Sequence, residues 1–328
     1  MKTIICAATC AVALAIHAAP EGFLTLAHTV PLPGVKGRFD HFAIDERGQR
    51  LFIAALGNDS LEIVDLGNAK RLHSITGLQK PTGVLYLTNA NQIAVASGDD
   101  GTVRVYEGRD YKSIATLKIL EDADNVRLDV KVNRVYVGYG DGALALIDPS
   151  DWKLLSRIKL PGHPESFQLE SRGDKIFVNV PDSKQVAIID RTKQAVVARW
   201  PLEKYQANFP MALDEPNHRL FVGCRKPARL IVFDTVTGKP FGDVAISGDT
   251  DDLFYDAKSN CIFLSCGEGF IDVVRQAGLD RYERINRIPT RTGARTSFFS
   301  LSRNEFYVAV PQQGSDSAEL RTYTVAGH

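Results

Sequence analysis

Residues 40–77, DHFAIDERGQRLFIAALGNDSLEIVDLGNAKRLHSITG, decide the fold of this chain. Short apolar segments alternate there with polar turns: DHFAID precedes ERGQR, LFIAA precedes LGNDS, and LEIVDL leads to RLHSITG. Apolar residues alternate with others inside the segments, as at Phe42 and Ile44, which is typical of half-buried strands. The stretch therefore predicts a unit of four antiparallel strands.

The same unit recurs along the chain about every 42 residues. Its second strand is the clearest marker, and the copies read LFIAA from Leu51, IAVAS from Ile93, VYVGY from Val135, IFVNV from Ile176, LFVGC from Leu220, IFLSC from Ile262 and FYVAV from Phe306. The residues equivalent to His41 are then Thr82, Asn125, Ser166, Pro210, Asp252 and Thr296. A repeat of this length with four strands per copy is typical of propellers. Seven copies predict an all-β fold, a seven-bladed β-propeller of four-stranded antiparallel blades.

The two ends of the repeat region predict that the ring closes. The seventh copy contains three strands, TSFFSLS, EFYVAVP and AELRTYTV, while FLTLAHTV at residues 23–30 is an extra strand before the first copy. Pairing this N-terminal strand with the last blade would complete that blade and remove open sheet edges. An open β-solenoid is the alternative, but it would leave the extra strand without a partner.

The repeats resemble the YVTN type found in bacterial YncE-like propellers. The segment GDGALALIDPSDWKLLSRIKLPGHPESFQL (140–169) carries the features: a strand that ends in Ile-Asp, a turn, and a strand that leads into a proline. The resemblance covers about residues 23–326 and implies a propeller and export, but no defined activity. The family's proline at the head of the first strand is present at Pro81, Pro164 and Pro210, and charged or polar residues replace it in the other copies.

The N-terminus has the regions of a secretory signal peptide in order. Lys2 is positively charged, residues 3–16 are apolar, and the small residues Ala18 and Ala19 each fit a cleavage site. The apolar stretch is shorter than the roughly 20 residues that span a bilayer, and no later segment could span one. We expect removal of residues 1–19, leaving residues 20–328 as a single domain in the periplasm or outside the cell. A retained anchor or a buried N-terminal helix is the alternative.

Charge and motifs exclude several function classes. Lys plus Arg and Asp plus Glu both number 39, so the chain lacks the basic excess of a nucleic-acid-binding protein. It also lacks a P-loop, a GxGxxG sequence after a strand, HExxH and GxSxG. No motif therefore supports a nucleotide-binding protein, a zincin-type metalloprotease or a serine hydrolase. We expect no nucleic acid, no membrane span and a monomer.

Candidate site residues follow from the repeat, because the start of each innermost strand and the loop between strands two and three share one face of a propeller. The residues at the strand starts are Asp40, His41, Thr82, Asp124, Asn125, Glu165, Ser166, Phe209, Pro210, Asp251, Asp252, Arg295 and Thr296. The loop residues are Asn58, Asp99, Asp141, Asp182, Arg225, Lys226, Glu268 and Gln312. Asp99, Asp141 and Asp182 are ordinary turn formers. The strand-start carboxylates are more informative, because a strand start needs no charge. As ligand-binding residues we predict Asp40, His41, Asp124, Asn125, Glu165, Arg225, Asp251, Asp252 and Arg295.

Two chemistries fit these residues. Crowded carboxylates raise one another's pKa or require a cation, so Asp40, Asp124, Asp251 and Asp252 could hold Ca²⁺ or Mg²⁺, with His41 as a ligand or general base. Alternatively, Arg225, Lys226 and Arg295 would flank Asp251 and Asp252, forming ion pairs with them or clamping a ligand carboxylate.

His163 lies in a linker between blades, so a direct functional role is less expected for it than for His41. Cys224, Cys261 and Cys266 remain after signal removal, and the spacing gives neither a disulfide framework nor a haem site. Cys224 and Cys266 share a repeat position in adjacent blades, so a disulfide, a soft-metal site and two buried thiols all stay open.

Two functions follow. The first is an exported binding or scaffold protein with a polar funnel for a small polar ligand or a protein partner. The second is a metal-assisted hydrolase or lyase that acts on a lactone, an ester or a sugar-acid-like compound, by analogy with other propellers.

Overall fold

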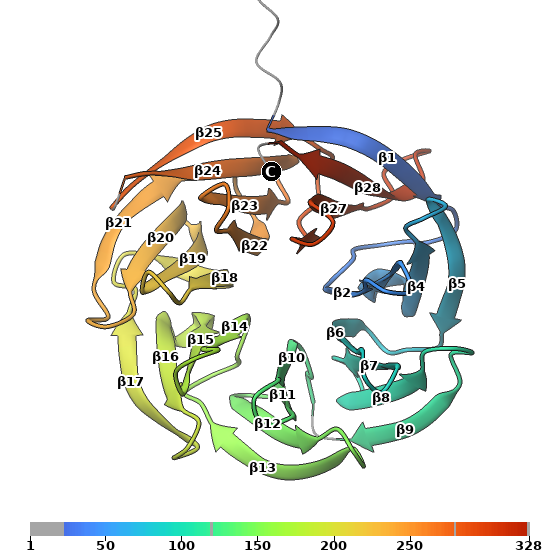
Figure 1. Cartoon of the computed structure of the whole chain (residues 1–328), viewed down its shortest axis with the longest axis horizontal. Coiled ribbons are helices and arrows are strands. Elements are labelled where there is room, and N and C mark those ends of the chain that lie inside the picture. The colour runs from blue at the N-terminus through green and yellow to red at the C-terminus, as the bar shows by residue number, and fades with distance from the viewer. Residues whose placement is uncertain (1–22, 119–120, 279, 327–328) are drawn as a thin grey trace, which may run out of the picture.

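The computed structural model describes residues 23–118, 121–278 and 280–326. Seven four-stranded antiparallel sheets surround a central axis, and the innermost strand of each is the first strand of its repeat copy (Figure 1). The predicted seven-bladed propeller is therefore confirmed. The expected signal peptide, residues 1–19, lies outside the described residues.

Six blades are continuous in sequence. The first comprises β2 (Phe42–Asp45), β3 (Arg50–Ala55), β4 (Ser60–Asp65) and β5 (Lys70–Thr76). The second comprises β6 (Pro81–Leu87), β7 (Gln92–Ser97), β8 (Thr102–Glu107) and β9 (Ser113–Lys118). The third comprises β10 (Val126–Asp129), β11 (Arg134–Tyr139), β12 (Ala143–Asp148) and β13 (Lys153–Lys159). The fourth comprises β14 (Phe167–Leu169), β15 (Lys175–Val180), β16 (Gln185–Asp190) and β17 (Ala195–Pro201). The fifth comprises β18 (Gln206–Asp214), β19 (Arg219–Lys226), β20 (Ala228–Asp234) and β21 (Pro240–Ala245). The sixth comprises β22 (Thr250–Asp256), β23 (Cys261–Cys266), β24 (Phe270–Gly278) and β25 (Arg281–Pro289).

The seventh blade closes the ring. It comprises β26 (Ser297–Ser300), β27 (Glu305–Val310), β28 (Ala318–Val325) and, as its outermost strand, β1 (Leu24–Leu32). Leu24 lies opposite Val325, and Leu32 lies opposite Ala318. The prediction that the N-terminal strand completes the last blade is confirmed, with the strand running two residues further than expected.

The hydrophobic core is divided among the contacts between blades. In β3, Leu51 and Ile53 pack toward the seventh blade, whereas Phe52 and Ala54 pack toward the second. Clusters of this kind lie between each neighbouring pair of blades in the described part of the chain. Because both faces of a second strand are buried, its sequence is continuously apolar. This explains why the second strands were the clearest markers of the repeat.

Helical structure is limited to two short 3₁₀ turns, η1 (Leu56–Asn58) and η2 (Pro181–Ser183), among the described residues. Within that part of the chain, no helix has the length and apolar character needed to cross a bilayer.

Candidate functional site

A polar cavity of about 260 Å³ lies at one end of the central channel, where the innermost strands begin. We call it the mouth cavity, and it is lined by Arg38, Asp40, His41, Thr82, Asp122, Asp124, Asn125, His163, Glu165, Ser166, Phe209, Arg225 and Asp251. The backbone N–H groups of Asp40, Asp124 and Glu165 donate to carbonyls at the ends of the second strands of their own blades, at 2.8–3.0 Å. The repeated backbone geometry thus brings equivalent residues of different blades toward one axis.

The structure gathers seven of the nine predicted ligand-binding residues in this cavity: Asp40, His41, Asp124, Asn125, Glu165, Arg225 and Asp251. Asp252 instead lines the next part of the channel, deeper along the innermost strands. There its carboxylate accepts a hydrogen bond from the Ser297 N–H at 2.7 Å and lies 3.4 Å from Nδ1 of His41.

Arg295 departs from the prediction. It was expected to flank Asp251 and Asp252, but its guanidinium lies 2.9–3.0 Å from the two carboxylate oxygens of Asp249. A tight turn before β26 fixes this direction, because the Arg295 N–H donates to the Gly293 carbonyl and Ser265 donates to the Arg295 carbonyl. The residue that completes this contact, Asp249, lies just before the predicted pair.

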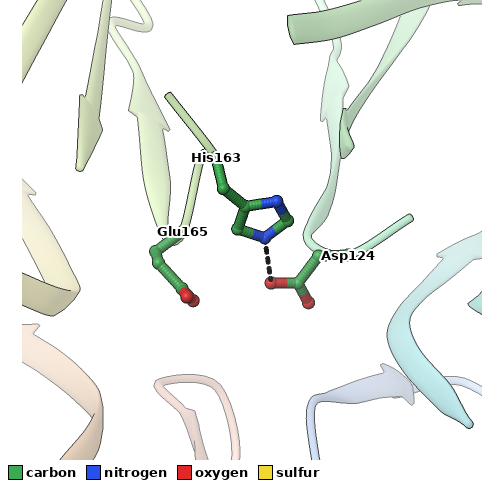
Figure 2. Close-up of side chains that lie close together, drawn as sticks. All are labelled: Asp124, His163 and Glu165. Carbon is green, nitrogen blue, oxygen red and sulfur yellow. Dashed lines mark ion pairs between the residues drawn. The ribbon is translucent and has the colours of Figure 1, made fainter. Parts of the chain in front are cut away.

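A cluster of two carboxylates and one imidazole occupies the mouth cavity. Asp124, His163 and Glu165 each offer a ligand atom, and these atoms lie within 4.8 Å of one another. Figure 2 shows the Asp124 and His163 side chains directed toward each other, with Glu165 beside them. Nε2 of His163 lies 3.9 Å from Asp124, while Nδ1 donates to the Gly140 carbonyl at 2.7 Å. That contact orients the ring and presents Nε2 to the cavity.

Burial and crowding shift the protonation of this cluster. Burial, reinforced by the negative charges of Asp124 and Asp251, raises the pKa of Glu165 to about 8. Burial opposes ionisation of Asp124, but the contacts with the His163 and His41 rings hold the pKa of that carboxyl below its usual value. Burial disfavours the charged ring of His163, yet its contact with Asp124 raises its pKa to about 9. At neutral pH the cluster therefore contains a protonated glutamic acid beside an aspartate–imidazolium pair.

His41 lies at the boundary between the mouth cavity and the deeper channel. Its Nε2 lies 3.6 Å from Asp40 and 3.9 Å from Asp124, opposite the contact of Nδ1 with Asp252. Burial disfavours the charged ring, but the surrounding carboxylates, with Asp40 first among them, raise the pKa of His41 to about 10. Burial also raises the pKa of Asp40 to about 7. His41 is thus a proton donor at neutral pH, whereas a general base would have to be neutral.

Asn125 is placed to respond to the charge of His41. Its Nδ2 lies 3.0 Å from Nε2 of His41, which suits an unprotonated ring nitrogen. Its Oδ1 is buried and has no hydrogen-bond partner within the described part of the chain. Rotation of the amide by half a turn would present this oxygen to a protonated ring, so Asn125 can serve both states.

Arg225, at the end of β19 in the fifth blade, also lines the mouth cavity. Its guanidinium donates to Asp251, lies 3.4 Å from Asp249 and stacks 3.7 Å from the centroid of Phe209. Burial raises the pKa of Asp251 to about 6, although Arg225 opposes the rise. The predicted pairing of Arg225 with the carboxylates of the sixth blade is therefore present for Asp251.

Three residues that line this cavity were not among the predicted ligand-binding residues: Arg38, Asp122 and His163. All three lie two residues before the strand-start pair of their blades. The equivalent residue of the sixth blade is Asp249, the partner of both Arg225 and Arg295. Extending the repeat comparison by two positions would have revealed that four of the seven blades carry a charged or titratable side chain there, whereas the others carry Gln79, Ala207 and Gly293.

The three cysteines of the described chain, Cys224, Cys261 and Cys266, are buried free thiols. The alternative of a disulfide is therefore wrong for these residues. Burial raises the pKa of the Cys224 thiol to about 12 and shifts those of Cys261 and Cys266 in the same direction. Thiols of this kind are poor metal ligands, because metals bind the thiolate.

Comparison with known proteins gives the fold. No model of a protein family matches the chain, and no curated protein matches it. Among solved structures, the chain is similar to one of Kuenenia stuttgartiensis hydrazine synthase, with 16% identity and a TM-score of 0.76 over 88% of this chain and 98% of that one. It is also similar to a chain in the crystal structure of a mitotic checkpoint complex, with 14% identity and a TM-score of 0.77 over the full length of both. At these identities the likeness establishes a shared β-propeller architecture.

Proposed function

We propose that the chain is a binding protein whose mouth cavity holds a small polar ligand through a divalent cation bound by Asp124, His163 and Glu165. We further propose that it belongs with the YncE-like propellers and acts in the periplasm or outside the cell. The composition of residues 1–19 supports export. The observation that carries the binding proposal is the cluster of three ligand atoms within 4.8 Å.

The orientation of His163 supports a metal site. A histidine that binds a metal through one ring nitrogen usually donates from the other to a carbonyl or carboxylate, and Nδ1 of His163 donates to Gly140 in this way. Donors around a bound zinc lie about 3.3 Å apart, given metal–nitrogen distances near 2.0 Å. Side-chain rotations that move each ligand atom by about an ångström would bring the three atoms to that separation.

The ligand set favours some ions over others. A set of oxygens alone suits Ca²⁺ or Mg²⁺, whereas an imidazole nitrogen with two carboxylates suits Zn²⁺ or Mn²⁺. Asp124 is the residue that this set shares with the four carboxylates considered from the sequence. A bound cation would also replace the proton on Glu165, which relieves the crowding of negative charge.

A cation in this position would leave coordination sites directed into the cavity. Arg38 and Arg225 both line the mouth cavity and carry positive charge. A ligand with a carboxylate or vicinal hydroxyl groups could bind the cation and accept hydrogen bonds from these side chains. Small polar anions are therefore the ligand class that fits best.

Calorimetry on chelator-treated protein tests the site. We expect one Zn²⁺ or Mn²⁺ per chain, binding more tightly than Ca²⁺ or Mg²⁺, with a loss of at least tenfold in affinity for His163→Gln. His28→Gln, an exposed histidine of β1, serves as the control and should bind as the wild type does. Absence of binding, or equal binding by His163→Gln, would contradict the proposal. Proton release on binding should also increase in buffers below pH 8, because Glu165 and His163 must lose protons.

A metal-assisted hydrolase or lyase is the second candidate, and the protonation of His41 favours it. A cation on Asp124 could polarise a carbonyl, while the His41 imidazolium could protonate a leaving oxygen. Glucono-1,5-lactone with Zn²⁺ or Mn²⁺ is a suitable probe. Hydrolysis that depends on the ion and is lost in His41→Gln would support an enzymatic function. A rate no higher than that produced by the ion alone would instead favour the binding function.

A further inference from the structure

Beyond the mouth cavity the channel continues into a chamber lined by both apolar and polar side chains, which we call the lower channel. It comprises a cavity of about 450 Å³ and an adjoining one of about 280 Å³ that share Arg127, Gln168, Asp252, Phe254 and Phe299. Tyr86, Leu128 and Phe298 complete much of the larger wall. Aromatic side chains that are half buried in a cavity wall are typical of sites for small apolar ligands.

One repeat position forms a ring around the lower channel. Counting two residues on from His41 and its equivalents gives Ala43, Val84, Gln168, Ala212, Phe254 and Phe298 in six blades, and Arg127 in the third. Each of these residues lines the chamber. Arg127 is therefore a single cation at a position where the other blades carry apolar residues or an amide.

Arg127 has no anionic partner among the residues that the structure describes. No carboxylate there lies within 4.0 Å of its guanidinium, whose hydrogen bond goes to the carbonyl of its own neighbour Val126 at 3.0 Å. The guanidinium lies 5.8 Å from the centroid of Phe167. An arginine has five N–H donors, so most of the hydrogen-bonding capacity of Arg127 stays available to the chamber.

Asp252, the acidic residue that lines the lower channel, already has partners of its own. Asp252 accepts from Ser297 and contacts His41, which carries a positive charge. Burial lowers the pKa of Arg127. The negative charges of Asp252 and Asp124 oppose this decrease, but neither carboxylate is in direct contact with the guanidinium. Arg127 is partly buried, and a cation withdrawn from water without a close partner carries a cost that an anionic ligand would reduce.

From this geometry we infer that the lower channel binds a small aromatic monocarboxylate, with Arg127 donating to the carboxylate and the ring packing against Phe254 and Phe299. A planar guanidinium matches one carboxylate in bidentate fashion. Arg127 and His41 are the basic residues that line the lower channel, so polyanions such as phosphates, which would need several cations, fit it less well. The binding requires no metal and is independent of the function proposed for the mouth cavity.

Titration calorimetry in EDTA, with 3-phenylpropionate and the matched neutral 3-phenylpropan-1-ol, tests the inference. We expect the acid to bind at least tenfold more tightly than the alcohol. Arg127→Gln should reduce the affinity for the acid at least tenfold and leave that for the alcohol unchanged, whereas Phe254→Ala should weaken both. Equal binding of acid and alcohol by the wild type, or no binding of either, would overturn the inference.

Two controls separate this result from other outcomes. Because the comparison of the two ligands uses the wild type, it remains decisive even if Arg127→Gln does not fold, and Arg127→Lys provides a variant that keeps the charge. His163→Gln should bind 3-phenylpropionate as the wild type does. If it binds the acid but no longer binds Zn²⁺ or Mn²⁺, the two sites are distinct; acid binding that is lost with His163 would contradict the assignment to Arg127.

Discussion

Replacement of Glu165 by glutamine tests the crowding of charge in the mouth cavity. Below pH 4.5 the carboxyl is protonated in both the unfolded and the folded protein, so the substitution should have little effect there. Between pH 4.5 and about 8, the folded protein retains a proton that the unfolded chain has released. The stability of the wild type should therefore fall with rising pH in this window. Glutamine carries no such proton, so Glu165→Gln should become the more stable protein as the pH rises.

The size of the effect follows from the pKa. A carboxyl whose pKa rises from 4.5 to about 8 costs the folded state at most ~5 kcal/mol when it ionises. The side chain faces a cavity and is half buried, so water and nearby charges screen part of this cost. We expect Glu165→Gln to be more stable than the wild type by ~2 kcal/mol or more at pH 9 in EDTA, with no gain at pH 4.

Urea unfolding followed by tryptophan fluorescence measures this difference across the pH range. Glu283→Gln, an exposed glutamate of the outer strand β25, is the control and should differ little from the wild type at any pH. Saturating Zn²⁺ or Mn²⁺ should reverse the order, because the cation stabilises the wild type more than the variant. A gain that does not depend on pH, or a variant less stable than the wild type in EDTA at pH 9, would refute the reasoning.

Three further predictions concern packing, protonation and processing. Gly83→Ala should destabilise the fold by ~1–3 kcal/mol in urea, because a Cβ there would lie 2.2 Å from the Asp124 carbonyl oxygen, whereas Gly242→Ala, with no atom within 4 Å, should be neutral. In ¹⁵N NMR spectra both ring nitrogens of His41 should be protonated at pH 8, and a neutral tautomer would argue against the expected pKa. Protein exported from a bacterial host should react slowly with a thiol reagent when native and show three thiols when denatured, while five would mean that residues 1–19 are retained.

The sequence was sufficient for the fold because each second strand is buried on both faces. That burial requires an apolar run in every blade, and the runs from Leu51 to Phe306 follow one another at spacings of 41 to 44 residues. Equivalent residues of different blades converge on the axis by symmetry. The repeat alone was therefore sufficient to predict that Asp40, Asp124 and Glu165 lie close together, as they do in the mouth cavity.

The direction of individual side chains could not be predicted in the same way. Arg295 occupies a strand start but is turned toward Asp249 by the tight turn before it, and Asp252 is held in the lower channel by the Ser297 amide. Such directions depend on single hydrogen bonds between blades, which no repeat pattern encodes. His163 was undervalued for another reason, since linkers lack the periodicity that identifies strands.

The pairing of β1 with β28 also constrains how the molecule can be assembled. It joins Leu24 to Val325, near the two extremes of the sequence, so the contact with the greatest separation along the chain is the one that completes the ring. The entropic cost of so long a loop is modest at equilibrium, because it grows only with the logarithm of length, but distant contacts form slowly. A nascent chain must therefore pass through an incomplete arc of blades with strand edges exposed. Protection from aggregation during synthesis then depends on how quickly the last strand becomes available to the first.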